Sequence, residues 1–104
     1  MRIGPFKQDT SLEEAVEAMV ESLDGASEEE RRLLTEYTGH KDDLFDNLME
    51  ILGLPSDDAC SWATQQAGNI GQERVDEAVT LLNRLLQAQG FALEPSHLEA
   101  LQGR

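Results

Sequence analysis

The stretch from Gln72 to Gln89 (QERVDEAVTLLNRLLQAQ) constrains the fold of this chain more than any other. On a helical wheel at about 100° per residue, its apolar residues fall within roughly 160° of arc, and polar residues occupy the opposite side. The apolar set is Val75, Ala78, Val79, Leu81, Leu82, Leu85 and Leu86. An apolar face this wide is typical of a helix that contacts more than one neighbour. The pattern therefore predicts the central helix of a small helical domain.

Other segments of the chain also show helical periodicity, and glycine or proline separates most of them. They span about 12–23, 27–38, 41–52, 57–67 and 95–101. Ser11 and Ser27 each begin a capping box with a glutamate three residues later. Asn69 with Gln72 predicts a further capping pair at the start of the central helix. The segment 27–38 has few apolar residues, so we expect it on the outside of the domain.

A chain of 104 residues is long enough to bury about two thirds of its unfolded surface as one domain. We predict an all-α fold, a compact bundle of five to six short helices around the central helix at about 72–89, in a single domain spanning residues 1–104. Residues 1–9 lack periodicity and are set apart as a tail that is either flexible or packed against the domain through Ile3 and Phe6. A minor strand is an alternative for Arg2–Lys7 or for Phe91–Leu93.

The charge balance is strongly negative, with 21 acids against 8 bases and a net charge of −13. Such a chain is repelled by nucleic acid and by anionic membranes, so we expect no direct binding to either. No run approaches the length of a membrane span, and the first residues lack a stretch of signal-peptide length. The single cysteine, Cys60, has no partner for an internal disulfide, which agrees with a reducing compartment. We therefore expect a cytoplasmic protein whose partner is a basic protein surface.

Candidates for catalysis and for metal binding are weak. His40 and His97 lie 57 residues apart, at a predicted helix junction and near the last helix, where histidines are usually solvated. Cys60 has no histidine near it in sequence and is predicted to be a half-buried packing residue. The acids at 42–46 lack the spacing of a calcium-binding EF-hand loop. We expect no enzymatic activity, no cofactor and no metal site.

The acidic helix faces are the remaining candidate for a binding site. Ten of the 21 acids lie in predicted first turns, where each stabilises its helix by about 0.3–1 kcal/mol. Helix stabilisation does not explain the lack of compensating charge, since nine acids and no base lie between Lys7 and Arg31. The segments 12–23 and 41–52 place their acids at equivalent wheel positions, which predicts one contiguous negative surface. The candidate partner-binding residues are Glu13, Glu14, Glu17, Glu21, Asp24, Asp42, Asp43, Asp46 and Glu50.

The leading hypothesis is a non-enzymatic inhibitor whose carboxylates occupy a basic, nucleic-acid-binding site on a partner protein. In composition, though not in any motif, the chain is similar to phage inhibitors of CRISPR complexes and to immunity proteins of toxic nucleases. The likeness implies a nucleic-acid mimic of phage or bacterial origin.

The alternative is a structural or adaptor protein that self-associates through apolar helix faces, with Leu81 and Leu85 continuing into the interface. A monomer and a homodimer therefore both remain open. Trp62, the only tryptophan, suits either the core or an interface.

Overall fold

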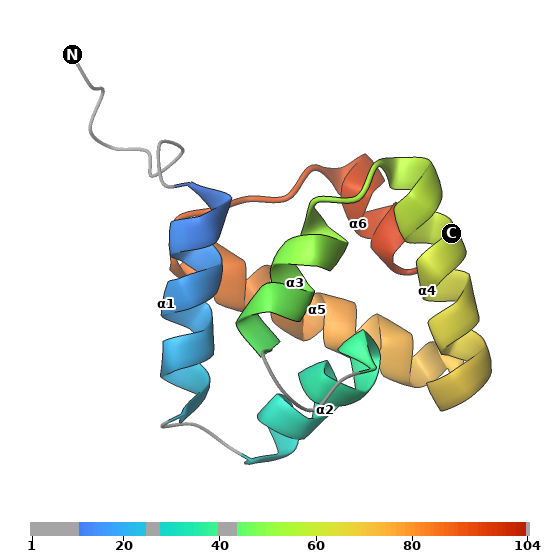
Figure 1. Cartoon of the computed structure of the whole chain (residues 1–104), viewed down its shortest axis with the longest axis horizontal. Helices are drawn as coiled ribbons and strands as arrows, with labels where there is room; N and C mark the ends of the chain where they lie inside the picture. Colours follow the sequence, from blue (N-terminus) through green and yellow to red (C-terminus); the bar gives the residue numbers. More distant parts are fainter. Residues whose placement is uncertain (1–10, 25–27, 40–43, 104) are drawn as a thin grey trace.

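Helices make up most of the described chain. The computed structural model describes residues 11–24, 28–39 and 44–103. Six helices lie within these ranges, namely α1 Leu12–Asp24, α2 Glu28–Thr38, α3 Leu44–Leu52, α4 Ser56–Ile70, α5 Gln72–Ala88 and α6 Pro95–Leu101 (Figure 1). Helix accounts for 84% of the described residues, and none of them is in a strand. The prediction of an all-α helical bundle is confirmed. The tail at 1–9 and the alternative strand at Arg2–Lys7 lie outside the described residues.

α5 is the central helix, as its apolar arc predicts. It contacts α1, α2, α4 and α6, and in Figure 1 it crosses the molecule behind α3. Six of the seven residues of the predicted arc are buried, and Leu85 is half-buried at the edge. The wide apolar face of α5 therefore packs against several neighbouring helices at once. Each fully buried leucine contributes about 1.5–3 kcal/mol to this packing.

α1 begins with the predicted capping box and packs against α3. The Ser11 hydroxyl oxygen accepts a hydrogen bond from the Glu14 backbone N–H at 3.1 Å, and the Ser11 N–H donates to the Glu14 carboxylate at 3.3 Å. The box satisfies two groups at the helix start that have no partner within the helix. The two helices contribute buried residues to one common core, namely Ala15, Val16, Met19 and Leu23 from α1 and Leu44, Leu48, Ile51 and Leu52 from α3.

The prediction that segment 27–38 lies on the outside is wrong. α2 packs against α5, and its Leu34, Tyr37 and Thr38 are buried. Tyr37 is among the largest fully buried side chains of the described residues. Counting apolar residues misses this contribution because a single tyrosine buries as much surface as several small residues do. The N-terminal residue of the predicted segment, Ser27, lies outside the described residues.

α4 differs from the predicted segment in its boundaries, whereas the predicted start of the segment 41–52 lies outside the described residues. α3 is described from Leu44, because residues 40–43 lie outside the described ranges. α4 continues to Ile70, so Asn69 lies inside a helix and does not cap α5. Its side-chain amide instead donates to the Gln66 side-chain oxygen at 3.1 Å. The predicted Asn69–Gln72 capping pair is therefore wrong.

Gly71 alone connects α4 to α5. Its φ of +95° is a backbone conformation that residues with a side chain rarely adopt. Its N–H donates to the carbonyl of Ala67 at 2.9 Å, and its carbonyl accepts from the Val75 N–H at 3.1 Å. One residue thus ends one helix, turns the chain and begins the next.

The last part of the described chain returns across the core. Residues 91–94 are neither helix nor strand, so the alternative of a strand at Phe91–Leu93 is not realised. Pro95 opens α6, where its missing N–H costs no helical hydrogen bond. α6 packs mainly against α4 and buries Ala100 and Leu101. Among the described helices, none combines the length and the hydropathy needed to cross a membrane.

Candidate functional site

The predicted acids of α1 lie on its solvent-facing side. Because Val16, Met19 and Leu23 turn inward, Glu13, Glu17 and Glu21 are left exposed at intervals of four residues. Glu14 is also exposed, but its carboxylate takes part in the capping box at the start of the helix. Asp24 is the last residue of α1. Three carboxylates therefore form one stripe along this helix.

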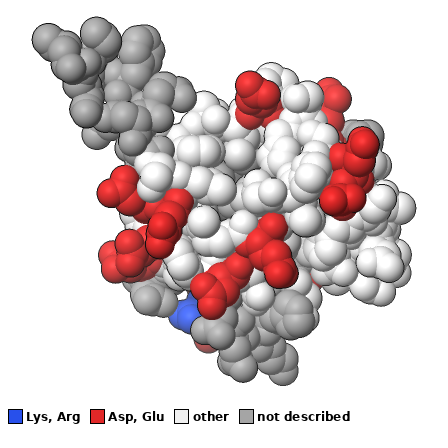
Figure 2. All heavy atoms as spheres, turned by 45° about the horizontal axis from the view of Figure 1, so that its top comes forward, with Lys and Arg blue, Asp and Glu red and all other residues white. Residues whose placement is uncertain are grey.

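α3 adds two of its four predicted acids. Asp46 and Glu50 are exposed one turn apart, on the side opposite the buried Leu44 and Leu48. Asp42 and Asp43 lie outside the described residues. Because α1 and α3 pack against each other, their acids lie on neighbouring helices. Figure 2 shows acidic side chains over the side where α1 lies and across the middle of the face, in groups separated by uncharged surface.

We call the exposed acids Glu13, Glu17, Glu21, Asp46 and Glu50 the α1–α3 surface. Neither helix contains lysine or arginine. The ion pairs Arg74–Glu36 and Arg84–Glu30 join α2 to α5, and the acids of the α1–α3 surface take no part in them. Its electrostatic potential is therefore negative and suits a cationic surface.

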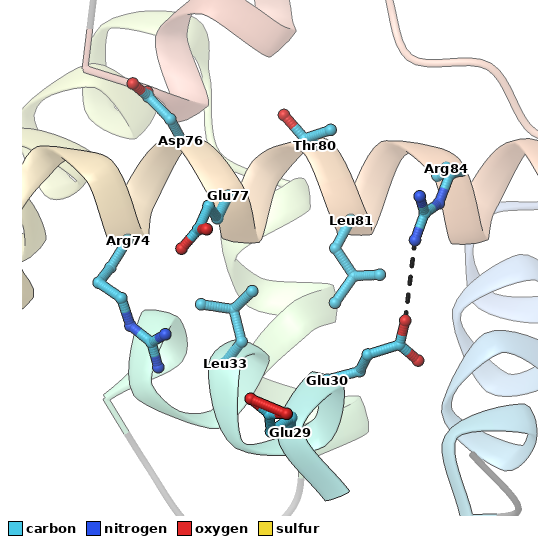
Figure 3. A pocket seen from close by; sticks show the side chains of 9 residues that line it. All are labelled: Glu29, Glu30, Leu33, Arg74, Asp76, Glu77, Thr80, Leu81 and Arg84. Atoms are coloured by element: carbon cyan, nitrogen blue, oxygen red, sulfur yellow. Dashed lines mark ion pairs between the residues drawn. The ribbon is translucent and has the colours of Figure 1, made fainter. Parts of the chain in front are cut away.

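A groove runs between α2 and α5, and sequence reasoning did not find it. The groove is open to solvent and has a volume of about 580 Å³. It is lined by Glu29, Glu30, Leu33, Arg74, Asp76, Glu77, Thr80, Leu81 and Arg84 (Figure 3). The spacing of Arg74, Glu77 and Leu81 on one face of α5 is visible in the sequence. The position of α2 opposite this face follows only from tertiary packing.

Ion pairs mark the two ends of the groove. At one end, the Arg74 guanidinium donates two hydrogen bonds to one Glu36 oxygen, at 2.6 Å and 3.2 Å. At the other, Arg84 lies 3.7 Å from a Glu30 oxygen. The hydrogen bond to Glu36 raises the pKa of Arg74 above its ordinary value, and the negative charges of Glu36, Glu77 and Glu29 add to this rise against a smaller opposing effect of desolvation. Three carboxylates thus act on one guanidinium.

A second hollow of about 490 Å³ lies beside Trp62, between α2 and α4. Trp62 is half-buried and meets the ring of Tyr37 edge to face, with centroids 4.8 Å apart and planes at 89°. Gln66 is nearly buried, and its amide donates to the Tyr37 backbone carbonyl at 2.7 Å, which satisfies a carbonyl at the C-terminus of α2. Trp62 thus packs on the core with one part and borders a hollow with another.

The residues considered for catalysis lie far apart in the chain. Cys60 is half-buried on α4, which matches the packing position predicted for it, and His97 is half-buried on α6. His40 lies outside the described residues. Among the residues with a described position, no three His, Cys, Asp or Glu side chains come together to hold a metal ion.

Comparisons with protein-family models, with curated proteins and with solved structures find no match to this chain.

Proposed function

We propose that this chain is a non-enzymatic protein-binding module of the cytoplasm that inhibits a partner by covering a basic, nucleic-acid-binding site. The α1–α3 surface would be the contact. In this proposal its carboxylates lie where phosphates would otherwise bind, and long-range attraction between the two proteins raises the rate of association.

One observation carries the proposal: five exposed acids on two neighbouring helices that contain no base. Helix stabilisation explains Glu13 and Glu14, which lie in the first turn of α1. It does not explain Glu17 and Glu21, because acids toward the C-terminus of a helix face the negative end of its dipole. A surface kept only for solubility usually mixes the two signs of charge.

The test is a charge reversal on α1. In the variant Glu13→Lys/Glu17→Lys/Glu21→Lys, three exposed side chains change and the buried face stays intact. Affinity capture from a lysate of the source cells, at low and at high salt, should recover a basic protein with the wild type and lose it with this variant. The captured protein, once purified, should release bound nucleic acid when the wild-type chain is added. The rate at which the wild-type chain associates with the captured protein should fall steeply as salt rises, while the dissociation rate changes less.

The matched control is Glu73→Lys/Glu94→Lys/Glu99→Lys. It makes the same change in net charge with three exposed residues that lie outside the α1–α3 surface and the groove. Glu73 lies in the first turn of α5, so it reproduces the helix-dipole cost of changing Glu13. Capture that survives in the α1 variant, or a nucleic acid that stays bound to the captured protein, would rule the proposal out.

The adaptor function remains the alternative, in which apolar faces self-associate. Of the two residues on which it depends, Leu81 is only 5% exposed within the single chain and Leu85 is half-buried. Sedimentation of the purified chain over a range of concentrations distinguishes the two proposals, because only self-association makes the apparent mass depend on concentration.

A further inference from the structure

The groove between α2 and α5 combines an apolar floor with an excess of negative charge. Leu33 of α2 is half-buried, and Leu81 of α5 points toward α2 from the other side of the groove (Figure 3). Arg74, Glu77 and Arg84 project from α5 toward α2 in the same view. A ligand in this groove would therefore contact apolar surface and carboxylates at the same time.

We propose that this groove is a docking site for a short basic amphipathic helix of another protein. An apolar side chain of that helix lies against the half-buried Leu33, above the largely buried Leu81, and a lysine or arginine beside it pairs with Glu77. The site lies on α2 and α5, so the proposal is independent of the function proposed for the α1–α3 surface.

Charge complementarity identifies the ligand as cationic. The groove and its border carry five carboxylates, from Glu29, Glu30, Glu36, Asp76 and Glu77, against two guanidinium groups. Both guanidinium groups already pair with a glutamate, Arg74 with Glu36 and Arg84 with Glu30. Glu77 is exposed between these pairs, so a third cation at this position would lower the local repulsion.

The arrangement of the carboxylates favours a peptide over a metal ion. No three acidic, histidine or cysteine side chains with described positions gather closely enough to hold a metal. The α5 edge of the groove runs from Arg74 to Arg84, ten residue steps along the helix at about 1.5 Å each, which is about 15 Å. Two to three turns of a second helix have the same length, and an amphipathic helix laid into a groove is a common mode of recognition.

A second copy of this chain is a poor ligand for the same groove. Each copy carries a net charge of −13, so the approach of two copies brings like charges together. Nucleic acid is excluded by the same repulsion. The occupant that fits is therefore a segment of opposite charge from another protein.

A defined peptide tests the proposal. The probe is a synthetic helical peptide of about 12–15 residues, with leucines at i and i+4 on one face and arginines on both sides of them. A matched peptide has serine in place of each leucine and the same charge. Titration of each into the isotopically labelled full chain, followed by amide NMR shifts, locates and measures binding. The leucine peptide should shift amides of α2 and α5 along the groove and bind at least about tenfold more tightly than the serine peptide.

Two variants with the same change in charge, Glu77→Lys and Glu99→Lys, test whether the peptide binds in the groove. Glu77→Lys should weaken binding of the leucine peptide by about tenfold or more, and Glu77→Gln should weaken it less. Glu99→Lys, on exposed α6 surface, should leave affinity within about twofold. Amide spectra of the free variants establish whether each one is folded. If Glu77→Lys is unfolded, the comparison with wild type is made with Glu77→Gln instead.

Three results would overturn this proposal. The first is equal affinity for the two peptides, or equal effects of Glu77→Lys and Glu99→Lys, since either means diffuse attraction. The second is a set of shifted amides on α1 and α3 in place of α2 and α5. The third is a dimer of the chain alone that Leu33→Ser disrupts, because the occupant would then be a second copy. Failure of the α1 charge reversal to alter partner capture leaves these readouts unchanged, so the two proposals fail separately.

Discussion

The Tyr37 hydroxyl, on α2, donates a buried hydrogen bond of 2.7 Å to the backbone carbonyl of Leu101, the last residue of α6. This bond ties a helix of the N-terminal half to the last helix of the described chain. Both residues are fully buried, so neither polar group has water as a substitute partner. Burial also raises the pKa of the Tyr37 phenol above its ordinary value of 10.0, which keeps the donor proton in place.

Replacement of Tyr37 by phenylalanine should destabilise the fold by about 1–3 kcal/mol, because the Leu101 carbonyl stays buried without its partner. Urea denaturation followed by the fluorescence of Trp62 measures this loss. Thr35→Ala is the control, since it removes an exposed hydroxyl that donates to the Arg31 carbonyl within the same helix. The control should stay within about 0.5 kcal/mol of wild type. Equal effects would mean that the interhelical bond adds nothing.

Tyr37 also predicts how stability depends on alkaline pH. Its pKa is raised in the folded state, so the unfolded chain releases the phenolic proton first as pH rises. The contribution of this group to stability should be constant below about pH 10 and should decline above it. Unfolding free energies measured between neutral and alkaline pH should fall less steeply in Tyr37→Phe than in wild type. Parallel curves for the two proteins would contradict this assignment.

Leu82→Ala should cost about 2–5 kcal/mol, because Leu82 is fully buried on the central helix. Glu77→Ala, on the exposed side of the same helix, should change stability by no more than about 0.5 kcal/mol. The comparison is made by urea denaturation of both variants. Similar losses would show that α5 is not oriented as described.

Replacing either of two neighbouring glycines by alanine should change the stability of the fold, and the two changes should have opposite sign. Gly68 lies within α4 and Gly71 follows it, and an added Cβ meets no atom within 4 Å at either site. Gly68→Ala should stabilise by about 0.5–1 kcal/mol, because alanine is the better helix former. Gly71→Ala should destabilise by about 1–2 kcal/mol, because φ at this residue is +95°. Thermal melts of the two variants that shift in the same direction would contradict this difference.

Modest salt should raise the melting temperature. The net charge of −13 produces repulsion within the folded chain, and salt screens it. Screening also weakens the favourable effect of first-turn acids such as Glu13 and Glu28, but repulsion involves all the uncompensated acids. Melting curves recorded between low and physiological salt test which effect is larger. A falling melting temperature would show that the helix-end interactions dominate.

The sequence predicts the parts of this fold that depend on local patterns. The arc from Val75 to Leu86 predicts the central helix, and the Ser11–Glu14 pair predicts a helix start, because each depends on residues a few positions apart. The pattern does not predict the role of Tyr37, because its partner lies 64 residues away. The sequence pattern also predicts an end of α4 that is too early. Gly68 and Asn69 are residue types typical of a turn, but both lie inside the helix.

The candidate surfaces divide in the same way. Exposure of Glu17 and Glu21 follows from the periodicity of α1 alone. The groove requires α2 and α5 to lie together, and no local pattern contains this information. On the helical wheel, Asp76 and Glu77 lie on the polar, solvent-facing side of α5. In the structure they line the groove.

The bond between Tyr37 and Leu101 has a consequence for synthesis of the chain on the ribosome. Its acceptor is translated 64 residues after its donor, which is roughly 3–13 s at about 5–20 residues per second. α6 is the last of the described helices to be translated, so this hydrogen bond forms only after the other five have been synthesised. The Tyr37 hydroxyl therefore lacks its native acceptor until α6 has been made, and this part of the core closes only after the other five described helices have been translated.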